Sequence, residues 1–259
     1  MKIDLEKREA GGGWIMENDS EQFSLNLPPT SSGSYTLAQL DDYMHLHRGE
    51  FPHQPPVSLQ LEARVSTPDM PGTWGFGFWN DPFSVGLGAG GMRRILPVLP
   101  NAAWFFYGSP PNHLSLRHDL PGCGFFAQVF RSPRLPSFLS LFGIPVLPFL
   151  QWPNTARILR KAAQALIDSD ALAVEIDVTE WHAYSLDLAK QGVGFSIDGR
   201  VVFNTPIVPK GRLGLVVWID NQYFSFTPEG RIGFGFLGMG TAQSMHIQNL
   251  SLSHDLRYE

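Results

Sequence analysis

Short segments in which apolar and polar residues alternate, separated by glycine and proline, dominate the chain. The alternation has the two-residue period of a β-strand, whose successive side chains point to opposite faces of a sheet. Twenty-six glycines and 21 prolines supply the turns between segments, so the pattern predicts an all-β protein. The predicted strands, a number typical of a sandwich or barrel, are Tyr43–His47, Val57–Ser66, Thr73–Trp79, Ala102–Tyr107, Phe125–Phe130, Ala173–Ser185, Gly194–Ile197, Val201–Phe203, Arg212–Ile219 and Met245–Ser253.

One stretch follows the period of an α-helix instead. Between Thr155 and Asp168, apolar residues recur at the spacing that places them on one side of a helix. This predicts an amphipathic helix of about four turns, which Asn154 or Thr155 can cap. Its apolar side comprises Ile158, Leu159, Ala162, Ala163, Leu166 and Ile167, and its polar side comprises Arg157, Arg160, Lys161 and Gln164.

An apolar run from Pro136 to Trp152 precedes this helix. It is slightly short for a membrane-spanning helix, and Pro145 and Pro148 interrupt it. We therefore expect residues 132–169 to form an insertion, an apolar proline-rich loop followed by the helix. A single β-sandwich domain of residues 1–259 would carry this insertion.

The composition supports a globular protein. Hydrophobic residues make up 43% of the 259 residues and charged residues 17%, which argues against long disordered segments. A net charge of −5 without a block of Lys or Arg argues against nucleic acid as a partner. Cys123 is the single cysteine and is expected to be a small apolar filler. The N-terminal residues lack the apolar core of a secretory signal, so we expect a cytoplasmic protein.

The segment 181–206 has the pattern of an antiparallel meander, with Asp198-Gly199 as the tight turn of a hairpin. The same segment resembles the concanavalin-A-like lectin/glucanase superfamily, in particular glycoside hydrolase family 16. In that family a Trp/Phe-His-x-Tyr strand, here Trp181-His182-Ala183-Tyr184, precedes an apolar strand that ends in Asp-Gly. A following strand places a Trp in the cleft, here Trp218. Residues 61–80 and 245–253 resemble further strands of the family.

This resemblance implies a concanavalin-A-like jelly-roll β-sandwich of two curved antiparallel sheets, with one inserted amphipathic helix. It is specific for the fold rather than for an activity.

Three carboxylates, Glu175, Asp177 and Glu180, have the spacing of the bulged catalytic motif of that family, Glu-x-Asp-x-x-Glu. By this resemblance, Glu175 would be the nucleophile and Glu180 the general acid/base of a retaining glycosidase. In the family, however, the motif lies on its own strand well before the Trp-His pair, whereas here it adjoins Trp181.

The strand in the expected catalytic place, residues 101–108, contains no carboxylate. We therefore interpret residues 175–180 as part of a half-exposed strand, in which Val174, Ile176 and Val178 face the core.

Other motifs carry weaker signals. Tyr43, His45 and His47 would share one strand face and, with Glu50, distantly resemble a cupin metal motif. A polar sheet face is the preferred interpretation, and we expect no metal ion.

A glycine-rich segment, residues 86–91, has the spacing Gly-x-Gly-x-x-Gly but lacks the strand and helix that a dinucleotide site needs. We expect no cofactor. Arg93 and Arg94 follow this segment and can meet an anion, whereas His113 and His118 cannot be positioned from sequence.

Aromatic residues supply the remaining candidates for a cleft. An aromatic wall with few polar groups suits stacking on sugar rings or enclosure of an apolar ligand. The candidate ligand-binding residues are Trp74, Trp79, Trp104, Phe106, Tyr107 and Trp218, together with Asp220, which shares a strand face with Trp218.

Three classes of function remain open. The preferred one is binding, or cofactor-free conversion of the isomerase or cyclase type, of a hydrophobic or aromatic-stacking small molecule in a concave aromatic cleft. Asp81, His113 or Asp220 would handle protons there. The alternative is a glycan-binding protein or a glycosidase that uses Glu175 and Glu180. The third is contact with a membrane surface or a partner through residues 136–167.

Overall fold

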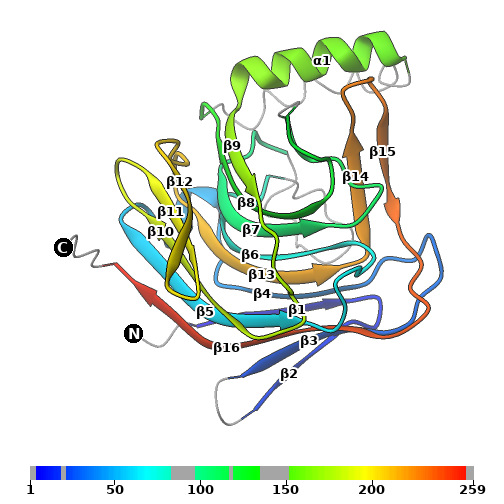
Figure 1. Ribbon diagram of the computed structural model, residues 1–259, viewed down its shortest axis with the longest axis vertical. Coiled ribbons are helices and arrows are strands. Elements are labelled where there is room, and N and C mark those ends of the chain that lie inside the picture. The colour runs from blue at the N-terminus through cyan, green and yellow to red at the C-terminus, as the bar shows by residue number, and fades with distance from the viewer. Residues whose placement is uncertain (1–3, 19–21, 83–96, 117–118, 135–151, 255–259) are drawn as a thin grey trace.

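Two large antiparallel sheets dominate the computed structural model (Figure 1), which describes residues 4–18, 22–82, 97–116, 119–134 and 152–254. Neighbouring strands in both sheets run antiparallel. Sheet A has the order β1 (Glu6–Ala10), β4 (Leu37–Asp41), β13 (Gly214–Asp220), β6 (Thr73–Trp79), β7 (Ala102–Gly108), β8 (Gly124–Arg131), β9 (Asp168–Ala173). Sheet B has the order β12 (Arg200–Thr205), β11 (Val193–Ile197), β10 (His182–Leu188), β5 (Val57–Val65), β16 (Gln243–Ser253), β3 (Phe23–Leu27), β2 (Trp14–Glu17). This is the jelly-roll β-sandwich predicted from the sequence.

The main hydrophobic core lies between the two sheets, and we call it the inter-sheet core. Alternate residues of each strand point into it, for example Trp74 and Phe76 of β6, Phe105 of β7 and Phe195 of β11. The remaining positions of sheet A form a second apolar cluster on its opposite face. Because sheet A is buried on both faces, its central strands β6, β7 and β13 contain almost no exposed residues.

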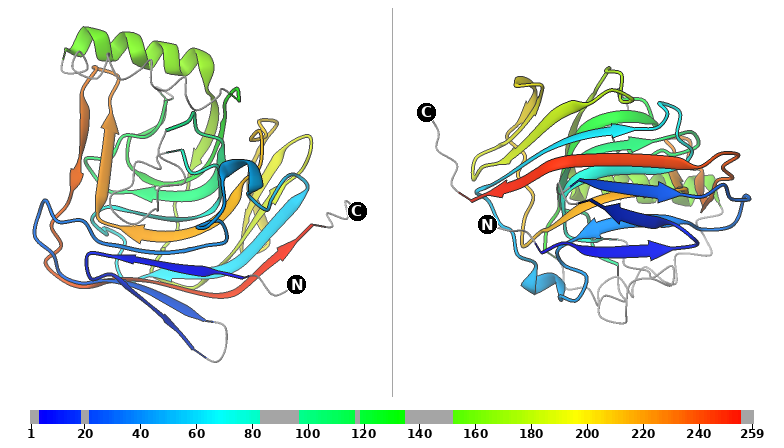
Figure 2. Two further views of the ribbon diagram at one scale, coloured as in Figure 1. Left: turned by 180° about the vertical axis from the view of Figure 1, so that it is seen from behind. Right: turned by 90° about the horizontal axis from the view of Figure 1, so that it is seen from below.

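A hairpin and a helix lie over the second face of sheet A. The hairpin of β14 (Gln222–Phe226) and β15 (Ile232–Phe236) follows β13 and stands up from the sheet, and α1 (Pro153–Leu166) crosses its tip (Figures 1 and 2). Arg160 connects the helix to β14 and to the segment between β7 and β8, because its guanidinium donates hydrogen bonds to the carbonyl oxygens of Phe226 and Ser115. Gln164 Nε2 donates to the carbonyl oxygen of Leu116 over 2.7 Å.

The predicted helix is present, but it begins two residues earlier and ends at Leu166. Trp152 occupies the N-cap position without a side-chain hydrogen bond, and Pro153 takes the first helical position, so neither Asn154 nor Thr155 caps it. Asp168 and Ser169 belong to β9, which means that the chain passes from the helix directly into sheet A.

The side of α1 that faces the protein contains both polar and apolar residues. Arg160 is only 2% exposed and Ala156 is fully buried, whereas Ile158 is 69% and Leu166 49% exposed. Arg160 and Gln164 hold the helix against the protein through hydrogen bonds, whereas Arg157 and Lys161 are exposed. The division into an apolar and a polar side therefore does not match the division into exposed and buried residues, since Ile167 of the apolar side is buried as well.

Two predicted strand segments are turns and loops. Residues 43–47 contain turns that lead into a 3₁₀ helix, η1 (Arg48–Glu50), and the strand of this region is β4. Residues 174–181 form the loop between β9 of sheet A and β10 of sheet B. Val178 in that loop is still buried in the inter-sheet core, so the apolar alternation reflects burial without strand pairing.

Some sequence-derived candidates lie outside the described residues, namely the glycine-rich segment 86–91, Arg93, Arg94, His118 and the apolar run up to residue 151. Within the part of the chain that the structure describes, no helix is long and apolar enough to cross a membrane.

Candidate functional site

Four large aromatic side chains gather on the second face of sheet A. Trp218, Trp79, Trp104 and Phe106 come from the adjacent strands β13, β6 and β7, and we call them the aromatic cluster. The rings of Trp79 and Trp218 are parallel within 3°, with centroids 6.1 Å apart. Trp104 lies 5.6 Å from Trp218 and 5.5 Å from Phe106. The structure therefore brings together four of the six aromatic residues predicted to line a cleft.

Glycines in the middle strand make room for these rings. Gly75 of β6 lies between Trp218 and Phe106 in the register of the sheet. A Cβ at Gly75 would stand 2.7 Å from the Trp218 ring, and one at Gly77 would stand 2.6 Å from the Trp104 Cα. The sequence of β6, Thr-Trp-Gly-Phe-Gly-Phe-Trp, thus places large side chains in the inter-sheet core. On the opposite face its two glycines leave space for the rings of the aromatic cluster.

The three indole N–H groups of the cluster are all used within the protein. Trp79 Nε1 donates to Tyr43 Oη over 2.6 Å, Trp104 Nε1 to Gln128 Oε1 over 3.1 Å, and Trp218 Nε1 to Thr73 Oγ1 over 2.9 Å. These hydrogen bonds fix the ring orientations. What the cluster can still offer a ligand is therefore its ring faces and edges.

Asp220 lies next to the cluster and is the most perturbed carboxyl of the site. Thr73 Oγ1 donates to Asp220 Oδ1 over 2.7 Å, and the backbone N–H of Gln222 donates to the same oxygen over 3.2 Å. Burial raises the pKa of Asp220 from 3.8 to about 7, although these hydrogen bonds favour the charged form. Near neutral pH this carboxyl can therefore either hold or release a proton.

Arg8 forms the polar edge of the same face. It pairs with Gln39 in the register of β1 and β4, and Gln39 pairs with Trp218, so the three residues lie in one row across the sheet. Arg8 Nη2 lies 3.8 Å from Asp41 Oδ2. Nε and Nη2 of Arg8 are buried and have no hydrogen-bond partner among the described residues. A buried guanidinium with unused donors is costly, so an acceptor placed at Nε and Nη2 would stabilise it.

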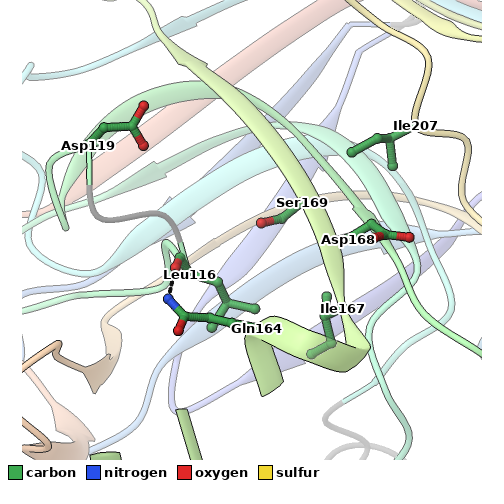
Figure 3. A pocket seen from close by; sticks show the side chains of 7 residues that line it. All are labelled: Leu116, Asp119, Gln164, Ile167, Asp168, Ser169 and Ile207. Carbon is green, nitrogen blue, oxygen red and sulfur yellow. Dashed lines mark hydrogen bonds between the residues drawn. The ribbon is translucent and has the colours of Figure 1, made fainter. Parts of the chain in front are cut away.

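A pocket of about 500 Å³ lies at the junction of α1 and β9 (Figure 3). Leu116 and Ile167 line it and also pack in the apolar cluster on this face of sheet A. Asp119, Asp168 and Ser169 supply its polar groups. Its volume lies in the range of small-molecule sites.

The other two predicted aromatic residues point the opposite way. Trp74 and Tyr107 lie in the inter-sheet core, where their rings stack with centroids 5.4 Å apart. Because neighbours along a strand face opposite sides, Trp74 cannot share a face with Trp79, nor Tyr107 with Phe106. These two residues are part of the core and not of the aromatic cluster.

The two other candidates for proton transfer, Asp81 and His113, do not lie on β13, the strand that carries Asp220. Asp81 is buried directly after β6, where Arg48 donates to its backbone carbonyl oxygen. His113 lies in the segment between β7 and β8, and its backbone pairs with β14.

The carboxylates of the glycosidase motif lie in the exposed loop between the two sheets. Glu175, Asp177 and Glu180 are all exposed. Asp177 accepts hydrogen bonds from the backbone and hydroxyl of Thr179, which lower its pKa. This arrangement is that of a turn.

The histidines of the metal motif do not share a strand face, since residues 43–47 are not a strand. His45 pairs with Glu6 over 2.8 Å, and His47 precedes η1. Within the described ranges no group of three or more His, Cys, Asp or Glu residues is arranged to hold a metal ion.

Sequence reasoning missed the polar partners of the site, namely Arg8, Gln39, Tyr43, Thr73 and Gln128. Thr73 was recoverable, because residues two apart share a face and opposite strand positions are neighbours. Arg8 and Gln39 lie on β1 and β4, whose short sequences carry no clear alternation.

Several solved structures are similar to this chain. One is a family 16 glycoside hydrolase from Bacteroides ovatus in complex with an oligosaccharide product, with 11% identity, coverage of 96% of this chain and 94% of that chain, and a TM-score of 0.49. A legume lectin-like domain from Entamoeba histolytica has 11% identity, coverage of 97% and 90%, and a TM-score of 0.46. A putative β-glucanase from Mycobacterium abscessus has 13% identity, coverage of 92% and 78%, and a TM-score of 0.45.

No family model and no curated protein sequence matches the chain. Family 16 glycoside hydrolases, which the sequence resembles, are thus among the proteins of similar structure, and this likeness concerns the fold.

Proposed function

We propose that the protein binds a small molecule whose apolar, ring-bearing part packs against the aromatic cluster. The observation that carries this proposal is the state of the three indoles. Their N–H groups all donate hydrogen bonds to other side chains of the protein. These bonds fix the orientations of the rings and leave no indole N–H for a ligand. A ligand recognised there is held by stacking and apolar contact.

Two further features support this class of ligand. Leu116 and Ile167, which pack in the apolar cluster on the same face of sheet A, line a pocket large enough for a small molecule. Arg8, at the other edge of the face, keeps buried donors that a ligand oxygen can satisfy. The ligand class is therefore an apolar molecule with at least one hydrogen-bond acceptor.

Asp220 is the candidate catalytic group if the bound molecule is converted. A carboxyl with a pKa of about 7 is suited to general acid or base catalysis near neutral pH, because both of its forms are then populated. The conversion would be a proton shift or ring closure without a cofactor. Asp220→Asn would then abolish turnover while leaving ligand binding intact.

Native mass spectrometry of the protein purified from its own host tests the binding proposal. We expect a retained small molecule, and we expect Trp104→Phe to lower the retained fraction. Trp181→Phe is the matched control, because Trp181 is exposed, lies in the loop just before β10 and is outside the aromatic cluster. No retained molecule, together with no ligand from a screen of apolar compounds, would mean that the aromatic cluster is only a second core.

A glycan is the alternative ligand, because sugar rings also stack on indole faces. The glycoside hydrolase of similar structure was solved with an oligosaccharide product. Titration of β-glucan oligosaccharides with tryptophan fluorescence as the readout separates the two classes. Saturable binding that Trp104→Phe weakens would assign the cluster to glycans, and hydrolysis that requires Glu175 and Glu180 would revive the glycosidase reading.

A specific observation favours a second function, attachment to an anionic membrane surface through α1. The outward side of the helix exposes Trp152, Ile158, Leu159 and Leu166. The helix also exposes Arg157 and Lys161 and contains no acidic residue, although the whole chain has a net charge of −5. Exposed apolar residues beside basic ones are typical of helices that lie in a membrane interface.

Vesicle co-sedimentation tests this second function. We expect binding to vesicles that contain phosphatidylglycerol, weaker binding to phosphatidylcholine alone, and loss of binding in Ile158→Glu. Val201→Glu is the control, since Val201 is an exposed apolar residue on β12. Self-association in sedimentation velocity that Ile158→Glu abolishes would show instead that a second copy of the chain covers the helix.

A further inference from the structure

A second pocket, of about 530 Å³, lies at the end of sheet A where β6 ends and β7 begins. Four basic residues line it, namely Arg48, Arg134, Lys210 and Arg212, together with the amide side chains of Asn80 and Asn101. None of the described residues that line it is acidic. We call it the basic pocket, and we propose that it binds the oxyanion group of a ligand, a phosphate, sulfate or carboxylate.

A buried asparagine brings the walls of the basic pocket together. Asn101 is 3% exposed, and its Oδ1 accepts hydrogen bonds from the backbone N–H groups of Ser132 and Lys210, over 3.1 and 2.7 Å. Its own backbone N–H donates to Asn80 Oδ1 over 3.0 Å. One side chain thus ties the segment after β8, which carries Arg134, to the segment before β13, which carries Lys210.

Two of the cations are fixed in place by backbone carbonyl groups. Arg48 Nε donates to the carbonyl oxygens of Asn80 and Asp81, both over 3.1 Å, and Arg212 Nη1 donates to that of Phe51 over 3.0 Å. A guanidinium has five N–H donors, so one such bond orients Arg212 without exhausting it. These two guanidinium groups therefore preorganise one part of the pocket for an acceptor, and the exposed side chains of Arg134 and Lys210 complete it.

Three of the four basic residues in the pocket form no ion pair with a described residue. Among the described residues, none of Arg134, Lys210 and Arg212 forms an ion pair, and the sequence between Thr205 and Leu213 contains no Asp or Glu. Like charges in one pocket repel each other, and a bound anion removes that repulsion while gaining charge-assisted hydrogen bonds. The basic pocket is therefore a local concentration of positive charge in a chain whose net charge is −5.

The position of the pocket suggests how an amphipathic ligand would use it. Leu99 lines the basic pocket and also packs against the apolar cluster that contains Trp104 and Trp218. An acidic group could therefore bind here while an apolar part lies toward the aromatic cluster. Anion binding itself does not depend on the function proposed for that cluster, so the two proposals can fail separately.

Isothermal titration calorimetry at constant ionic strength tests the inference, with inorganic phosphate, sulfate and glucuronate as the probes. We expect saturable binding of at least one of them by the full chain. Lys210→Glu and Arg134→Glu should each weaken it about tenfold or more, as loss of a charge-assisted contact predicts. Both residues are exposed, so the variants should keep the wild-type circular dichroism spectrum and melting temperature.

Arg200→Glu is the matched control, because Arg200 is also exposed but lies on β12 at the edge of sheet B. It makes the same change in net charge and should leave the affinity within about twofold, since distant surface charges are screened by salt. Preference for phosphate and sulfate over glucuronate would identify a phosphate-type ligand, and the reverse would identify an acid sugar or another carboxylate. No binding of any probe, or equal affinity in wild type and both pocket variants, would overturn the proposal.

Discussion

Replacing Asp220 with asparagine tests whether the face of sheet A that carries the aromatic cluster holds a neutral carboxyl. The pKa of Asp220 is raised from 3.8 to about 7 by burial. At about 1.4 kcal/mol for each pKa unit, the ionised form is disfavoured in the folded protein by about 4 kcal/mol. The hydrogen bonds from the Thr73 hydroxyl and the Gln222 backbone N–H end on Oδ1, an acceptor that the asparagine side chain also provides.

The sign of the pH dependence follows from which state ionises first. Below pH 3.8 Asp220 is protonated in both states and has no effect on stability. As the pH rises from 3.8 to about 7, the unfolded chain ionises while the folded protein keeps its proton, so the wild type loses stability. The Asp220→Asn variant has no carboxyl to ionise at this position, so its stability does not fall for this reason. The variant should therefore gain stability relative to wild type, by an amount that grows to about 4 kcal/mol at pH 8.

Urea unfolding followed by tryptophan fluorescence, at intervals between pH 4.5 and 8.5, measures this difference. Cost or gain from the new amide N–H groups shifts the whole difference curve without changing its slope. Asp168→Asn is the control, because Asp168 is exposed and pairs with Arg131, so its effect should stay below about 1 kcal/mol. A difference between Asp220→Asn and wild type that changes by less than about 1 kcal/mol over this range would refute the reasoning.

Three further substitutions probe the core, the cluster and the loop between the sheets. Phe105→Ala removes a fully buried ring from the inter-sheet core and should lower the unfolding free energy by about 3–5 kcal/mol in urea. Gly75→Ala places a methyl group 2.7 Å from the Trp218 ring; it should cost about 1–3 kcal/mol and alter the near-UV circular dichroism spectrum. Glu175→Gln combined with Glu180→Gln should leave the thermal midpoint and ligand binding unchanged, as both side chains are exposed; reduced binding would place them in the site.

The strands that pack on both faces were predictable because their composition is unmistakable. The bounds predicted for Thr73–Trp79 are those of β6, and those for residues 102–107 differ from β7 by one residue. Strands β1 to β4, β9, β14 and β15 were missed, since short strands such as Ile-Gly-Phe-Gly-Phe, residues 232–236, have a weak period-two signal.

Side-chain orientation was harder to predict than element type. Residues 174–178 alternate as a strand does and bury Val178, yet their backbone crosses between the sheets. For α1, both sides can contact a protein: Arg160 lies over the Phe226 ring, 5.6 Å from its centroid, and bonds to carbonyl groups. The hydrophobic pattern of the helix cannot predict which side contacts these carbonyl groups, because they belong to segments far away in the chain.

The place of β16 in sheet B has a consequence for biosynthesis. This strand lies between β5 and β3, although it follows every other described strand in sequence. Until residues 243–253 have left the ribosome, β5 and β3 each keep an unpaired edge in the middle of the future sheet, and such edges invite pairing with other chains. We expect the nascent protein to stay incompletely folded and dependent on chaperones until that strand inserts, so a chain shortened by even this one strand should accumulate as aggregate.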